Sequence, residues 1–331
     1  MKYYHFVSNN SMDVFIHKKS KKKTVRAGIR NMEQQSQRTS INRFPYGEAH
    51  MHIFMNGTDY KKAVADQKNG VCDRVIHAHL AEYRKRGITW LREGGDIYGT
   101  SKRTMELAPA YGITYRTPIF AIHKKGHYGA IVGRGYETMQ EYRKLIRDLR
   151  RQGGHFVKIM ISGIMDFTHG GLTEPSLADS EIHELIHIAH EEGFPVMAHT
   201  NGSQAVRAAA LAGVDSIEHG NFCDEDALQA LAASDAVWVP TIVTVKNLLG
   251  DGRFPEQVVK NIWEGQKKAL LRGYQLGAKL ALGSDAGAYR VLHGQGLLDE
   301  YRAFREILEE DFPDWEKRIR NGDRLIKERF S

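Results

Sequence analysis

The sequence predicts a (β/α)8 barrel, a single ring of parallel strands surrounded by helices. Three observations lead to this prediction. From residue 46 onward short apolar runs alternate with longer amphipathic stretches, the alternation repeats eight times, and the longer connections follow the apolar runs. Alternating strands and helices build a parallel sheet with right-handed crossovers, and such a barrel needs about 250 residues. An open doubly wound sheet is the alternative, but it gives no reason for the alternation to stop at eight.

The apolar runs have the length and the β-branched content of strands that are buried on both faces, as parallel strands are. Each run is bounded by polar or glycine-containing segments, so its extent can be read from the sequence. We expect strands at residues 49–54, 88–92, 113–120, 156–161, 195–198, 214–217, 236–243 and 278–282.

The amphipathic stretches between these runs predict helices, and several of them have recognisable ends. Ser203 and Asp224 are interpreted as N-caps, and a glycine follows the last turn of six helices, at residues 87, 112, 153, 193, 213 and 277. An additional helix at 313–330, with Trp315 and Ile319 as packing residues, follows the barrel. The barrel helices are expected at residues 73–86, 102–111, 137–151, 177–192, 203–212, 224–233, 256–276 and 296–310.

The charge distribution argues against a nucleic-acid partner. The formal net charge is +7, but residues 1–49 carry ten Lys and Arg against three Asp and Glu, most densely at 18–23, and the remainder is neutral. Because no aromatic residues are interleaved with these lysines, residues 1–45 are interpreted as a solvated, partly flexible basic arm and residues 46–331 as the barrel domain. An anionic partner of the arm is the alternative.

No membrane association is expected either. No apolar run approaches the roughly 18 residues that span a bilayer, and the first residues lack the basic-then-apolar layout of a secretory leader. The two cysteines are too few for a disulfide framework and suit a reducing compartment. We therefore expect a cytoplasmic protein. A small-molecule partner and a homo-oligomeric state are separate expectations.

Ligand-type residues occur where the first and fourth strands are expected. His50 and His52 are two apart in a strand and can both face the barrel axis. Lys158 lies within an apolar run, where an ammonium is costly to bury. Lys158 has two interpretations: it reaches the barrel mouth as an ordinary lysine, or its neutral amine reacts with carbon dioxide to give a carbamate that bridges two cations.

Three later strands end in a further ligand-type residue each, namely His199, His219 and Asp285. Taken singly, each is an ordinary polar group at a strand end. Together with His50, His52 and Lys158 they converge on the carboxyl ends of the strands, where barrel enzymes keep their active sites. Imidazole and carboxylate ligands without thiolates favour zinc, with manganese and iron as alternatives.

These segments resemble the amidohydrolase superfamily, in particular its dipeptidase-like and imidazolonepropionase-like branch. The matching segments are EAHMH, GITWLREGGD, HFVKIMISG, VMAHTNGSQAVRAAALAGVDSIEHG and LALGSDAG, which lie in the order and at the spacing of that family. The resemblance covers residues 48 to about 310.

The resemblance implies a binuclear hydrolase that cleaves an amide or related C–N bond in an N-acyl amino acid, a dipeptide or a cyclic amide by metal-activated hydroxide. By this resemblance His50 and His52 hold the more buried ion, His199 and His219 the more exposed one, and carboxylated Lys158 bridges them. Asp285 contacts the buried ion and passes a proton to the leaving amine. His219 and Asp285 are the predicted catalytic residues.

Three residues in the long loops are candidates for substrate contacts. His127 and His293 follow the third and eighth strands, where family members often place such histidines. Arg134 could pair with a substrate carboxylate. Ordinary solvated loop residues are the alternative for all three.

The sequence also departs from the family pattern. The usual flanking β-sandwich is not recognisable, the segment FPYGE at 44–48 replaces the usual entry to the first strand, and Asn201 stands where a second histidine is common. Two further functions therefore stay open. One is a lactonase or phosphoesterase that uses the same ions, and the other is a catalytically silent relative whose basic arm binds an anionic partner.

Overall fold

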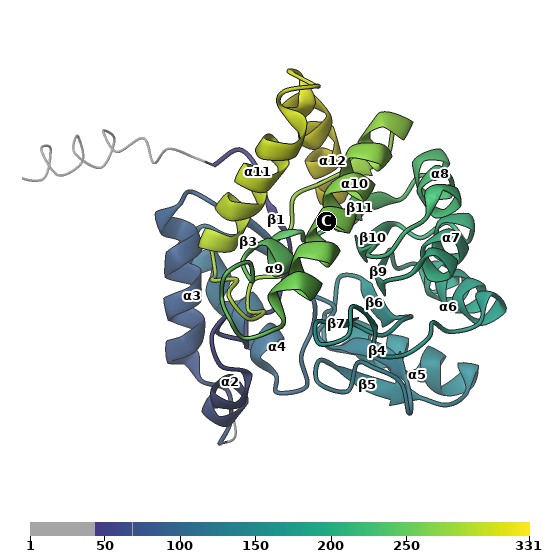
Figure 1. Ribbon diagram of the computed structural model, residues 1–331. Coiled ribbons are helices and arrows are strands. Elements are labelled where there is room, and N and C mark those ends of the chain that lie inside the picture. The colour runs from purple at the N-terminus through teal and green to yellow at the C-terminus, as the bar shows by residue number, and fades with distance from the viewer. Residues whose placement is uncertain (1–43, 68) are drawn as a thin grey trace, which may run out of the picture. The chain divides into compact units, whose positions relative to one another are not determined.

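The computed structural model describes residues 44–67 and 69–331 (Figure 1). The predicted basic arm therefore lies outside the described residues except for Phe44 and Pro45, and its boundary and role stay predictions. Within the described residues, no helix combines the length and the apolar character that crossing a bilayer requires.

The described residues form the predicted (β/α)8 barrel. Parallel pairing runs through β1–β2–β3 and through β12–β11–β10–β9–β6–β4, and β3 and β4 are successive parts of the third barrel strand. The ring closes because Ala49 donates to the Leu282 carbonyl at 3.1 Å and Asp285 donates to the His50 carbonyl at 2.8 Å. The barrel strands are β1 (Glu48–Met51), β2 (Trp90–Glu93), β3 (Thr114–Arg116), β4 (Ala121–Lys124), β6 (Val157–Met160), β9 (Val196–Thr200), β10 (Ser216–His219), β11 (Val237–Val239) and β12 (Lys279–Leu280).

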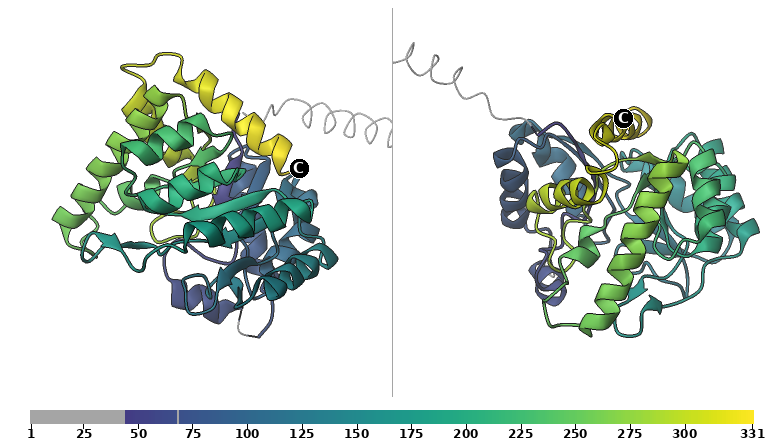
Figure 2. Two further views of the ribbon diagram at one scale, coloured as in Figure 1. Left: turned by 90° about the vertical axis from the view of Figure 1, so that its right-hand side faces the viewer. Right: turned by 45° about the horizontal axis from the view of Figure 1, so that its top comes forward.

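Helices surround this ring, and α6, α7 and α8 lie side by side along one flank (Figures 1 and 2). The glycines predicted at the ends of helices, residues 87, 112, 153, 193, 213 and 277, all have positive φ, as expected for this role. The helices are α3 (Asp73–Lys85), α4 (Thr100–Leu107) with the 3-10 helix η1 (Ala108–Tyr111), α5 (Met139–Arg151), α6 (Asp179–Glu191), α7 (Ser203–Leu211), α8 (Glu225–Ala233), α10 (Glu256–Leu276), α11 (Gln295–Leu308) and α12 (Trp315–Arg329).

Some predicted boundaries were wrong. Asp224 caps α8 as predicted, but Ser203 is the first residue of α7 and Gly202 is its N-cap. The seventh strand ends at Val239 instead of continuing to residue 243, where the short helix α9 (Val243–Lys246) begins. The Glu300 carboxylate on α11 accepts the backbone N–H groups of residues 242 and 243, a long-range contact that local sequence does not reveal.

The loops after the strands contain short elements that the sequence pattern did not predict. The helix α2 (Tyr60–Asp66) has Asp59 as its N-cap, and the Asp59 side chain accepts the Lys62 backbone N–H at 3.0 Å. The strand β5 (Gly133–Tyr136) pairs with β4 on the outside of the ring, and β7 (Met165–Asp166) forms a hairpin with β8 (Gly171–Leu172).

The helix α12 closes the amino-terminal end of the barrel. It approaches β12 so closely that a Cβ atom on Gly322 would lie 1.9 Å from the Leu280 carbonyl oxygen. The predicted packing residues Trp315 and Ile319 are buried, and the Phe330 ring lies edge-on to Phe156 at 5.2 Å. An apolar layer therefore seals this end of the barrel, and the opposite end is left for a site.

Candidate metal centre

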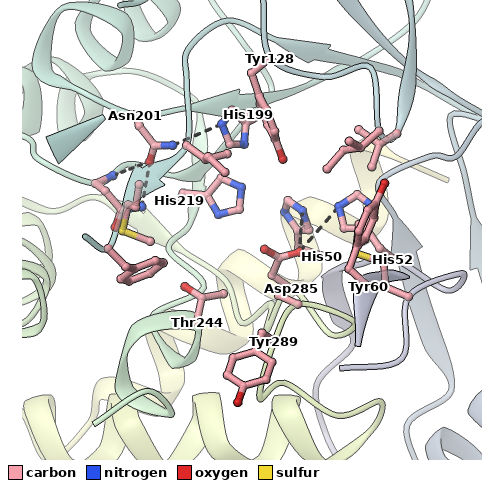
Figure 3. Close-up of a pocket in the computed structure, with 18 of the residues that line it drawn as sticks. His50, His52, Tyr60, Tyr128, His199, Asn201, His219, Thr244, Asp285 and Tyr289 are labelled. Atoms are coloured by element: carbon pink, nitrogen blue, oxygen red, sulfur yellow. Dashed lines mark hydrogen bonds and ion pairs between the residues drawn. The ribbon is translucent and has the colours of Figure 1, made fainter. Parts of the chain in front are cut away.

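The carboxyl ends of the strands open onto a cavity of about 260 Å³ (Figure 3). The structure brings all six predicted ligand residues to its wall, from β1, β6, β9, β10 and the segment after β12. Except for Asp285, which is partly exposed, they are buried. These residues are His50, His52, Lys158, His199, His219 and Asp285.

His50 on β1, His52 directly after β1, and Asp285 form one side of the site. His50 and His52 alternate with outward-facing residues, and their Nε2 atoms lie 3.6 and 3.7 Å from Asp285 Oδ1. Gly94, which follows β2, makes room for this arrangement, because a Cβ atom there would lie 2.3 Å from Cε1 of His52. The three side chains therefore point into the same part of the cavity (Figure 3).

The β9 and β10 histidines form the other side. The ring centroid of His219 lies 4.7 Å from that of His199 and 4.9 Å from that of His50. His219 has φ 69° and Asp285 has φ 59°, left-handed conformations that are unfavourable for residues with side chains. Such strain is typical of functional positions, and here it occurs where each strand turns over the barrel mouth.

Buried partners orient the histidine rings. His50 Nδ1 lies 2.6 Å from Glu218, whose other oxygen accepts from Arg92 at 2.8 Å. Because this carboxylate accepts hydrogen bonds, Nδ1 of His50 carries the proton and Nε2 offers its lone pair toward Asp285. His219 Nδ1 contacts the Thr241 hydroxyl at 2.8 Å, which likewise leaves Nε2 toward the cavity. Partners of this kind fix the tautomer of metal-binding histidines.

A chain of carboxamides supports His199. Its Nε2 lies 3.2 Å from the Gly163 carbonyl and 3.3 Å from Asn201 Nδ2, so Nδ1 is the nitrogen left for a ligand. Asn221 donates its backbone and side-chain N–H groups to Asn201 Oδ1, and Gln266 donates to Asn221 Oδ1 at 2.6 Å. The asparagine that departs from the family pattern thus helps to position His199.

Lys158 is the most unusual member of the site. The residue is 1% exposed, and Nζ has no hydrogen-bond partner among the described residues. Burial lowers the pKa of Lys158 to about 8, although the Glu218 carboxylate opposes this shift. A substantial fraction of the amine is therefore neutral near physiological pH, which is the nucleophilic form.

The protonation of the remaining groups fits a divalent cation. Burial, followed by the nearby Lys158 charge, lowers the pKa of both His52 and His199 to about 3, so these imidazoles are neutral. Neutral imidazole is the form that binds metals. The ligand atoms of His50, His219 and Asp285 lie within 4.8 Å of one another, close enough to share one ion. The donor set therefore fits a metal.

Asp285 differs from an ordinary aspartate. Burial raises its pKa to about 6, although the Lys158 ammonium opposes the shift. A carboxyl group that titrates near neutral pH can accept and return a proton under physiological conditions.

The rest of the cavity wall is mainly apolar. Phe167 and Phe254 face each other at 5.2 Å, and the Tyr128 ring lies 5.2 Å from His199. Arg253 is the only arginine in the wall within the part of the chain that the structure describes. A wall of this composition suits a substrate with a substantial apolar part.

The structure does not bring the three predicted substrate residues to this cavity. His127 lies 3.6 Å from Glu174, and the buried His293 is held between the Met55 carbonyl at 2.8 Å and the Tyr83 hydroxyl at 3.2 Å. Arg134 is on β5, where it pairs with Asp148 and covers the Phe120 ring. None of these three lines the cavity, so as substrate contacts they stay predictions that the geometry does not support.

Sequence reasoning missed several residues of the site. Arg92 is a charged residue within an apolar strand, the same signal that identified Lys158, and could have been found in that way. Glu218 immediately precedes a predicted ligand but belongs to no recognisable spacing. Thr241 and Arg253 lie in loops after the seventh strand, and their proximity to the site depends on loop conformation.

Comparison with known proteins places these observations in a family context. The sequence pattern of the amidohydrolase family matches residues 48–310. An uncharacterized protein of Mycobacterium tuberculosis is 26% identical over 168 residues, which are 49% of this chain and 44% of that protein. Ochratoxinase of Aspergillus niger is 24% identical over 198 residues, 58% of this chain and 39% of that protein. The chain thus spans less than half the length of either relative.

Solved structures resemble the barrel at low sequence identity. A Xaa-Pro dipeptidase with bound methionine superposes with a TM-score of 0.66 at 20% identity, covering 85% of this chain and 75% of that one. A. niger ochratoxinase superposes with a TM-score of 0.64 at 17% identity, covering 79% and 66%. At these identities the likeness concerns the fold.

Proposed function

Because this chain belongs to the amidohydrolase family, we propose that it is a metal-dependent hydrolase that cleaves an amide or related C–N bond of a small substrate. The observation that carries the proposal is that four histidines, Asp285 and Lys158 meet on the wall of one largely apolar cavity. The Lys158 amine has no hydrogen-bond partner among the residues that the structure describes. A barrel that needed these residues only for stability would have no reason to gather them at one mouth.

We further propose a binuclear centre. His50 and His52 would hold one ion and His199 and His219 the other, and carboxylated Lys158 would bridge them. Zinc suits imidazole and carboxylate ligands best, with manganese and iron as the alternatives. The lowered pKa of Lys158 supports the carbamate, because only a neutral amine adds to carbon dioxide.

Divalent cations at this site supply a Lewis acid for the scissile carbonyl and a nucleophile at neutral pH. The chain itself supplies positioning and proton transfer. Asp285, with a pKa of about 6, accepts a proton at a carboxylate oxygen and delivers it to the leaving nitrogen. The apolar wall excludes bulk water, which strengthens these electrostatic interactions.

We propose a cytoplasmic enzyme with a small-molecule substrate, no nucleic-acid or membrane partner, and a homo-oligomeric state. The names of the structural relatives favour dipeptides as the first compounds to test, since one of them is a Xaa-Pro dipeptidase.

The test compares turnover in four preparations: metal-stripped protein, zinc-reconstituted protein, and reconstituted Asp285→Asn and Asp148→Asn variants. Asp148 lies on α5 at the outer face and is the matched control. We expect turnover of N-acyl amino acids, dipeptides or cyclic amides by the reconstituted wild type and the control only. Full activity without metal would remove the proposal. Turnover of lactones or phosphotriesters alone would favour the lactonase or phosphoesterase alternative.

A further inference from the structure

Among residues 44–67 and 69–331, one cationic side chain lines the cavity in addition to the six predicted ligand residues. Arg253 lines the wall, and it forms no ion pair with any residue that the structure describes. Among the described residues, Asp285 is the only acidic one in the wall, and its carboxylate belongs to the proposed metal centre. The charge of Arg253 is therefore not balanced by an acidic residue of the cavity.

The position of Arg253 is defined by aromatic rings. It lies between α9 and α10, with its guanidinium carbon 4.1 Å from the Tyr289 ring centroid and 5.4 Å from that of Phe254. Tyr289 follows Asp285 by four residues, and Figure 3 shows both beside the same cavity. Contact with a ring face holds a guanidinium while its N–H groups remain available as donors.

The neighbouring Arg290 provides an internal comparison. Its guanidinium also lies near the Tyr289 ring, at 5.5 Å, but Arg290 forms an ion pair with Asp251. Two guanidinium groups therefore lie near the Tyr289 ring, and the Asp251 carboxylate is paired with that of Arg290. Of the two arginines, only Arg253 lines the cavity.

We propose that Arg253 is a specificity-determining residue that binds a carboxylate of the substrate. The preferred substrate is then an amide with an apolar body and one free carboxylate, the chemistry of an N-acyl amino acid or a dipeptide. The guanidinium fork matches a carboxylate through two parallel hydrogen bonds, and Phe167 and Phe254 offer apolar surface for the body of the substrate. This inference rests on the proposed function and moves the carboxylate contact from Arg134 to Arg253.

The experiment uses metal-loaded protein and pairs of amides that differ only in the carboxylate. N-acetyl-L-phenylalanine is paired with N-acetyl-2-phenylethylamine, and other N-acyl amino acids and dipeptides are paired in the same way with their decarboxylated counterparts. KM and kcat are measured for the wild type and for Arg253→Ala, Arg253→Lys and Arg134→Ala. Arg134→Ala is the matched control, because that arginine pairs with Asp148 and is not among the residues that line the cavity.

We expect the wild type to favour the carboxylated member of each pair. Arg253→Ala should raise KM for that member roughly 10- to 100-fold, the contribution of a charge-assisted bidentate contact, and leave KM for the neutral member unchanged. For Arg253→Lys we expect a KM between those of the wild type and Arg253→Ala, because lysine keeps the charge but cannot form two parallel hydrogen bonds to a carboxylate. Arg134→Ala should resemble the wild type.

A binding measurement gives a second readout that does not depend on turnover. Calorimetry should show that 3-phenylpropanoate binds the wild type more tightly than 3-phenylpropan-1-ol, and that Arg253→Ala removes the difference.

The two proposals fail in different ways. If the wild type hydrolyses no amide of either kind, the proposed function fails and this inference fails with it. If it hydrolyses both members of each pair equally well, or if Arg253→Ala affects both equally, only the role of Arg253 is overturned. The same conclusion follows if Arg253→Ala leaves the binding of 3-phenylpropanoate unchanged.

Discussion

The two ends of the barrel interior are equally buried but differ in how their side chains are satisfied. On β6 and its approach, Phe156 and Lys158 are two residues apart and face the same side, at 0% and 1% exposure. Phe156 packs against Phe330, whereas the Lys158 amine has no partner among the described residues. On β9, Met197 and His199 repeat this step from an apolar to a polar residue.

This difference indicates that the two ends of each strand have different roles. The amino-terminal end is packed with apolar side chains, and the carboxyl-terminal end carries polar side chains that are costly to bury. Between the two ends, Arg92 and Glu218 form a buried ion pair at 2.8 Å, and Arg92 also donates to the Ala49 carbonyl at 2.7 Å. This pair links the stable end to His50.

Truncation at the packed end should have the largest effect on stability. Phe330→Ala removes a fully buried ring that contacts Phe156 and lies 4.3 Å from the Arg92 guanidinium carbon. We expect the free energy of unfolding to fall by about 3–5 kcal/mol in urea denaturation. Leu211→Ala, at a position that is 70% exposed, is the control and should stay within about 0.5 kcal/mol. A loss below about 1 kcal/mol for Phe330→Ala would contradict a stabilising role.

Removing the Lys158 amine at the carboxyl-terminal end should instead raise the free energy of unfolding. Lys158→Met replaces an unsatisfied amine by an apolar side chain of similar length, and we expect the metal-free protein to gain about 3 kcal/mol at pH 7. The same variant should lose activity. Lys144→Met, on the exposed face of α5, is the control and should change stability little. Destabilisation by Lys158→Met would show that the amine has a stabilising partner.

The pH dependence of this gain follows from the pKa of Lys158, which folding lowers from 10.5 to about 8. Well below pH 8 the amine is protonated in both the folded and the unfolded state, so the folded wild type bears the full cost of the buried charge. Between pH 8 and 10.5 the unfolded state binds more protons, and the stability of the wild type rises with pH. The advantage of Lys158→Met should therefore shrink across this window. An advantage that is constant from pH 7 to 10.5 would contradict the lowered pKa.

Replacing Glu218, which lies between the two ends of the barrel, should have a smaller effect, and this effect is on zinc affinity. Glu218→Gln keeps an oxygen for Arg92 but turns an amide N–H toward His50 Nδ1, which favours the tautomer that blocks Nε2. We expect zinc affinity, measured by competition with a chelator, to fall about 10- to 100-fold. Glu225→Gln, on the exposed start of α8, serves as the control. An unchanged zinc affinity of Glu218→Gln would show that Glu218 does not support metal binding.

The parts that were predicted correctly from the sequence are those fixed by local patterns. The strand-and-helix alternation and the terminal glycines depend on neighbouring residues. The convergence of His50, Lys158 and His199 on one cavity follows from the topology of a closed parallel barrel. These features therefore needed no information about loop conformation.

The parts that were missed or placed elsewhere depend on contacts between distant segments. The Glu300 carboxylate on α11 accepts the backbone N–H groups at the start of α9, so the chain turns into this helix and the seventh strand is shorter than predicted. The long helix α10 separates α9 from α11 in the sequence. Arg134 pairs with Asp148, whereas Arg253 reaches the cavity because its loop folds against Tyr289. Spacing along the sequence does not determine such loop contacts.

We propose that six side chains at the carboxyl ends of the strands hold divalent cations together. A crystal structure of the zinc-reconstituted protein tests it most directly. We expect zinc within about 2.0–2.2 Å of nitrogen and oxygen ligands from both pairs of histidines and Asp285, with a carbamate on Lys158 as the shared ligand. Zinc bound elsewhere, with an unmodified Lys158 amine and the histidines free of metal, would contradict the claim.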